Sequence, residues 1–165
     1  MADKSSFTPE EWKVVLSSPM LAGLAVTMAE PSGIWGMLKE SMASANAVLA
    51  AGKDANASPL MKALLADMET SEGRTTARDE ITAGLKGKTP AEMKELVIAK
   101  LGQAGKILDT RAPNEAAAFK SWLKYVADQV AESASERGVL GFGGTRVTDN
   151  ERATIAEVGR ALNAA

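Results

Sequence analysis

A repeated pattern of helix starts constrains this fold more than any other feature of the sequence. The pattern Thr-x-x-Glu occurs at Thr8–Glu11, Thr89–Glu92 and Thr148–Glu151. In such a capping box the threonine hydroxyl accepts a hydrogen bond from the third helical N–H, and the glutamate carboxylate accepts one from the threonine N–H. Pro9 and Pro90 follow two of these threonines, at the helical position that needs no N–H donor. Each pattern therefore predicts the first turn of an α-helix.

Apolar residues recur at steps of three and four behind these starts, as on one face of a helix. Ser18-Pro19 resembles a further start, of a helix Met20–Met28 that is apolar around its whole circumference and should lie at the centre. A shorter helix is expected over Thr75–Lys86, with Glu72 and Gly73 ending the helix before it. Further stripes begin near Ile34 and after Pro59, Pro90, Pro113 and Thr148.

Strand signals are nearly absent, since the one stretch with some β character, Val139–Val147, is interrupted by glycines. We therefore predict a single all-α domain over residues 1–165, with about seven to eight helices around a central apolar one. Residues 1–6 are expected to be flexible. On the helix after Pro113, the expected outer face carries Lys120, Lys124, Asp128 and Glu132.

The chain has no His and no Cys. Catalytic relays that use either residue cannot be built from it, and neither can zinc, haem or iron–sulfur sites that depend on them. Catalysis would need carboxylates, lysines, Tyr125 or a cofactor. Nothing in the sequence specifies a cofactor or a metal, and a metal, if bound, would take oxygen ligands.

The net charge and the hydropathy of the chain limit the kinds of partner and location that the sequence predicts. The formal net charge is −2 with scattered basic residues, which argues against nucleic acid as a partner. The longest uncharged stretch, Val14–Ala29, is shorter than the ~20 apolar residues of a membrane span and contains polar residues. No secretory signal is visible, so a cytoplasmic location is expected.

Two segments depart from ordinary helix and turn chemistry. Gly138–Gly144 concentrates four glycines ahead of Arg146 and a helix start, so its backbone could approach an anion closely. It lacks the closing residues of a nucleotide-binding loop, and an apolar connector is the competing interpretation. The candidate ligand residues here are Gly141, Gly143, Gly144 and Arg146.

The second segment, Asp67–Glu80, combines five acids with two arginines. Glu72, Arg74 and Arg78 are its candidate ligand-binding residues, and a solvated turn is the competing interpretation. The leading hypothesis for function is an interaction or small-ligand-binding protein, which forms a homo-oligomer or takes a small apolar or anionic ligand. The alternative is an enzyme or divalent-ion-binding protein that uses these carboxylates and arginines, with the glycine-rich loop as a lid.

Overall fold

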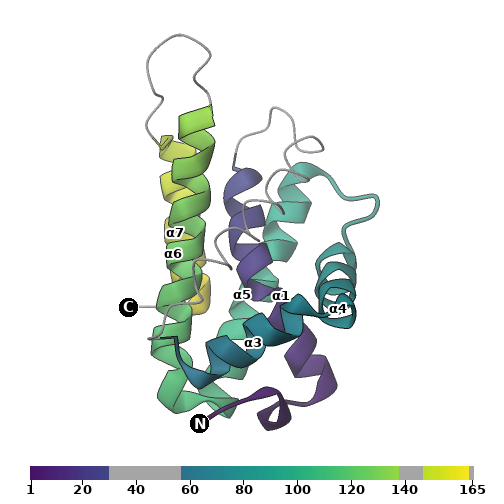
Figure 1. The fold of residues 1–165 in the computed structure, drawn as a ribbon. Coiled ribbons are helices and arrows are strands. Elements are labelled where there is room, and N and C mark those ends of the chain that lie inside the picture. The colour runs from purple at the N-terminus through teal and green to yellow at the C-terminus, as the bar shows by residue number, and fades with distance from the viewer. Residues whose placement is uncertain (30–56, 138–146, 164–165) are drawn as a thin grey trace.

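The computed structural model describes residues 1–29, 57–137 and 147–163, with the side chains of 133–137 left out. These ranges contain one short 3-10 helix and six α-helices, and they contain no β-strand (Figure 1). The elements are η1 (Lys4–Ser6), α1 (Pro9–Thr27), α3 (Pro59–Glu69), α4 (Ser71–Thr82), α5 (Pro90–Arg111), α6 (Pro113–Arg137) and α7 (Asp149–Leu162). The all-α prediction is confirmed, with six helices in the described residues rather than seven to eight.

α1 is the buried helix of the fold. Every residue from Val14 to Met28 is buried, and α1 contacts α3, α4, α5, α6 and α7. Figure 1 shows α1 and α5 between the α6–α7 pair on one side and α4 on the other. A helix that is apolar all round must be covered on all sides, so the composition of α1 dictates this arrangement.

The predicted helix start at Ser18-Pro19 is wrong, because Pro19 lies inside α1. A proline within a helix leaves the carbonyl four residues earlier, here that of Val15, without its N–H donor. The Ser18 hydroxyl donates to this carbonyl at 2.6 Å. The helices predicted before and after Pro19 are therefore one continuous helix, α1. The predicted helix that begins near Ile34 lies outside the described residues.

The corner between α3 and α4 also differs from the prediction. Thr70 ends α3 and caps α4, because its hydroxyl accepts from the Gly73 N–H at 2.9 Å. α4 therefore begins at Ser71 instead of Thr75, and Glu72 and Gly73 lie in its first turn instead of ending the previous helix. Gly73 permits this tight corner, since a Cβ there would lie 2.0 Å from the Asp67 carbonyl oxygen.

Lys120 does not lie on the outer face of α6 as the sequence pattern predicts. Its side chain is 4% exposed, and its Nζ lies 2.7 Å from both carboxylate oxygens of Asp109 at the end of α5. α6 packs on α1, α5 and α7, so its buried arc is wider than one apolar stripe and includes this position. Lys124 and Asp128 are half-buried, and Glu132 is exposed.

Candidate functional site

The predicted ligand residues on α4 have exposed side chains. Arg74 donates from Nη1 to the carbonyl oxygens of Glu69, at 2.6 Å, and Met68, at 3.3 Å. These carbonyls belong to the last turn of α3, where a cation is favourable. Glu72 and Arg78 are exposed in other turns of α4. Arg74 therefore has a structural role, and ligand binding by these three residues stays a prediction.

The other predicted ligand residues, Gly141, Gly143, Gly144 and Arg146, lie outside the described residues. The idea that this loop and the α4 residues form one site therefore stays a prediction as well. Among the residues that the structure describes, no three acidic side chains gather closely enough to hold a metal ion. None of the described helices is long and apolar enough to cross a membrane.

Charged side chains of the described residues form contacts between elements. Lys100 pairs with Glu80 at 3.0 Å, joining α5 to α4, and Asp67 of α3 accepts from Lys4 of η1 and from the Trp12 indole of α1. Pairs of this kind contribute little to stability when they are exposed to solvent. The other pairs between elements are Glu11–Arg111, Lys94–Glu157 and Asp109–Lys120.

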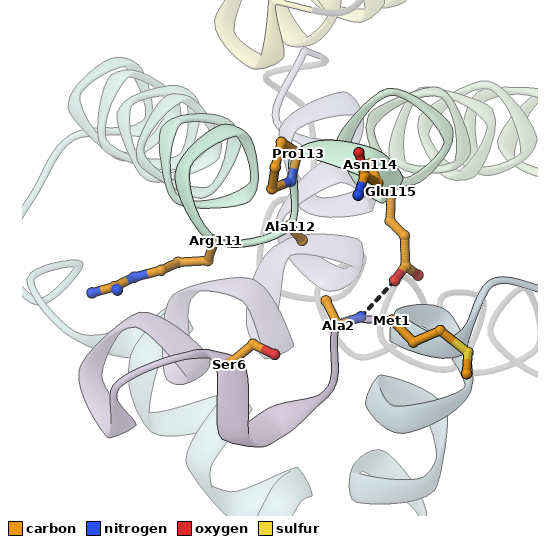
Figure 2. Close-up of a pocket in the computed structure, with 8 residues that line it drawn as sticks. All are labelled: Met1, Ala2, Ser6, Arg111, Ala112, Pro113, Asn114 and Glu115. Carbon is orange, nitrogen blue, oxygen red and sulfur yellow. Dashed lines mark hydrogen bonds between the residues drawn. The ribbon is translucent and has the colours of Figure 1, made fainter.

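A small pocket of about 150 Å³ lies between the N-terminal residues and the α5–α6 corner (Figure 2). Its acidic side chain, Glu115, accepts hydrogen bonds from the N–H groups of Ala2, at 2.7 Å, and Leu60, at 3.0 Å. The Arg111 side chain extends away from Glu115 in Figure 2 and pairs with Glu11. The charged groups that line the pocket are thus engaged within the protein.

The exposed face of α6 is unusual among the described helices because no charged residue from Pro113 to Tyr125 is exposed. We call this face the α6 strip, and its exposed residues are Pro113, Asn114, Ala117, Ala118, Ser121 and Tyr125. By contrast, α4, α5 and α7 all expose charged side chains, among them Glu72, Arg78, Asp79, Glu92, Glu95, Lys106, Asp149, Arg152 and Arg160.

Tyr125 is the large residue of the α6 strip. It is 51% exposed, and Met1 is the other large hydrophobic side chain that the described residues expose. The neighbouring Trp122 is half-buried and packs edge-on against the buried Phe119, with ring centroids 5.4 Å apart. The sequence alone indicates that Tyr125 is exposed, because it lies off the apolar stripe of Phe119, Leu123 and Val126. A single exposed tyrosine does not by itself predict a binding face.

Comparison of the chain with protein families, with curated proteins and with solved structures found no match.

Proposed function

We propose that this protein works by association, and that the α6 strip docks on the α6 strip of a second copy of the chain. The observation that carries the proposal is Tyr125, half-exposed at the end of an uncharged helix face. A tyrosine offers a large contact area with only two rotatable side-chain bonds, so it loses little entropy when it is fixed in an interface. The alanines and the serine beside it allow a second helix to approach closely.

The spacing of the strip suits pairing between helices. Asn114, Ala118, Ser121 and Tyr125 follow one another at steps of four, three and four, the spacing of a helix–helix seam. If two copies of α6 cross in antiparallel fashion with Ser121 at the two-fold axis, Tyr125 of each copy faces Ala117 and Ala118 of the other. Large side chains then pack against small ones on both sides of the axis.

The charges on α6 favour the antiparallel direction. Asp128 and Glu132 follow the strip on the same helix, and its start, at Pro113 and Asn114, is uncharged. With Ser121 at the axis of an antiparallel pair, Asp128 faces Asn114 at the uncharged start of the other copy. A parallel pair would place the two Asp128 side chains together and the two Glu132 side chains together, and like charges at close range are unfavourable.

Sedimentation velocity over a range of concentrations tests the proposal. We expect a reversible dimer, and we expect Tyr125→Glu to weaken it at least about tenfold by placing a charge in the seam. Ala156→Glu is the matched control, because it adds the same charge at an exposed position of α7 and should leave the dimer intact. A protein that stays monomeric at all concentrations, or equal weakening by both variants, would overturn the proposal.

A further inference from the structure

The first seven residues are held to the helices by carboxylates as well as by apolar contacts. We call Met1–Phe7 the strap. The Ala2 N–H donates to Glu115 of α6 at 2.7 Å, and Lys4 Nζ donates to Asp67 of α3 at 3.0 Å. Within the strap, Asp3 caps η1 by accepting from the Ser5 N–H at 2.8 Å.

Apolar contacts of the strap are few. Ala2 and Phe7 are its buried residues, and the Phe7 ring packs against Trp12 with a centroid distance of 5.5 Å. Ala2 and Phe7 both belong to the hydrophobic core, and a short segment with two such anchors can still open locally at a free energy below that of global unfolding. The carboxylate contacts add to this apolar anchoring in keeping the strap closed.

We propose that the strap is an acid-releasable element, which leaves the helices as a unit when Glu115 and Asp3 lose their negative charge. A protonated carboxyl group is a weaker acceptor, both for the Ala2 N–H at Glu115 and for the Ser5 N–H at Asp3. Glu115 also accepts from the Leu60 N–H, so its protonation weakens the start of α3 together with the strap.

The positively charged side chains near the strap are paired with other carboxylates. Lys4 of the strap pairs with Asp67 at 3.0 Å. Arg111 lines the same pocket as Glu115, but it pairs with Glu11 at 3.0 Å.

The pH range of release follows from Glu115 and Asp3. Burial of Glu115 raises its pKa, but the N–H bonds from Leu60 and Ala2 outweigh burial and hold the pKa below the ordinary value of 4.5. Hydrogen bonds from Ser5 lower the pKa of Asp3 below 3.8. A lowered pKa means that each group stabilises the closed strap above its ordinary pKa, and that this stabilisation is lost as the pH falls through the lowered value.

Thiol labelling tests the proposal, because the chain has no cysteine of its own. Ala2→Cys places one thiol under the closed strap, and Ala127→Cys, at a fully buried position of α6, reports global opening. Rates are measured from pH 7 to pH 3 with a disulfide reagent that reacts in acid, and each is normalised to the unfolded chain at the same pH. We expect the labelling rate of the Ala2→Cys variant to rise about tenfold or more below pH 4, while that of the Ala127→Cys variant stays low.

A pair of variants separates charge loss from general destabilisation at pH 7. Glu115→Gln in the Ala2→Cys background should raise the labelling rate about tenfold. Glu92→Gln is the matched control, because Glu92 also accepts a backbone N–H bond, from Thr89, but does so at the start of α5. Equal rates in the two variants would overturn the proposal. So would labelling at the strap thiol that rises in acid only together with labelling at the buried thiol of α6.

Discussion

Gly73 has no room for a side chain. A Cβ there would lie 2.0 Å from the carbonyl oxygen of Asp67, and that oxygen belongs to the backbone of α3. Gly73→Ala must therefore push α3 and α4 apart, and we expect it to lower the free energy of unfolding by about 2 kcal/mol or more. Urea denaturation measures the change.

Gly87→Ala provides the control for this substitution. Gly87 has a φ of +79°, and no atom lies within 4 Å of its ideal Cβ. Only backbone strain opposes alanine there, which costs about 1 kcal/mol. A loss at Gly73 no larger than the loss at Gly87 would show that the α3–α4 corner relaxes easily.

The Lys120–Asp109 pair predicts an asymmetry between its two partners. Lys120 is 4% exposed and Asp109 is 51% exposed. Asp109→Ala leaves a buried ammonium without its anion, and we expect a loss of about 1–2 kcal/mol because solvent screens the exposed half of the pair. Lys120→Met keeps the packing and removes the buried charge, so it should cost less. Thermal and urea unfolding of both variants measure the two losses in the free energy of unfolding. A larger loss for Lys120→Met than for Asp109→Ala would contradict the prediction.

At the scale of the helix, Ser18 and Pro19 act together within α1. The Ser18 hydroxyl donates to the Val15 carbonyl, the group that Pro19 leaves without an N–H donor. Ser18→Ala should therefore cost about 1 kcal/mol. In a Pro19→Ala background the backbone N–H returns, and the same serine substitution should cost almost nothing. A double-mutant cycle measures this coupling, and additive effects would contradict it.

The capping boxes of α1 and α5 predict a pH dependence of stability. Hydrogen bonding from the Thr8 N–H lowers the pKa of Glu11, and the Thr89 N–H does the same for Glu92. Because both pKa values are lowered on folding, these caps stabilise their helices above about pH 4.5 and lose this effect as the pH falls further. NMR titration of the side-chain carboxyl groups should find both midpoints below that of an unfolded reference, and ordinary midpoints would show that the caps are weak in solution.

Helix starts were predictable wherever the signal is local. The capping boxes at Thr8, Thr89 and Thr148 form as their spacing indicates, because all of their atoms lie within one turn. The helix start at Thr70 was not predicted, because position 73 is a glycine and not the glutamate of a capping box. The helix start predicted at Ser18 was wrong because a serine followed by proline can also lie inside a helix. There its hydroxyl replaces the N–H donor that the proline lacks.

At the scale of the whole molecule, sequence periodicity could not say which helix faces become covered. Lys120 is charged but buried, because Asp109 of the neighbouring helix α5 supplies a carboxylate that pairs with it. Arg74 is in an acid–arginine segment but caps α3 with its guanidinium. The uncharged α6 strip becomes apparent only when exposure is known along the whole helix. Non-local packing decides these roles.

The most direct test of the central claim, pairing through the α6 strip, is self-crosslinking by a single engineered cysteine. Ser121→Cys places one thiol at the proposed two-fold axis of a chain that has no other thiol. The antiparallel dimer predicts rapid disulfide formation between two copies under mild oxidation, and Ala156→Cys on the exposed face of α7 should crosslink far more slowly. Equal crosslinking rates at the two positions, or none at position 121, would contradict the account.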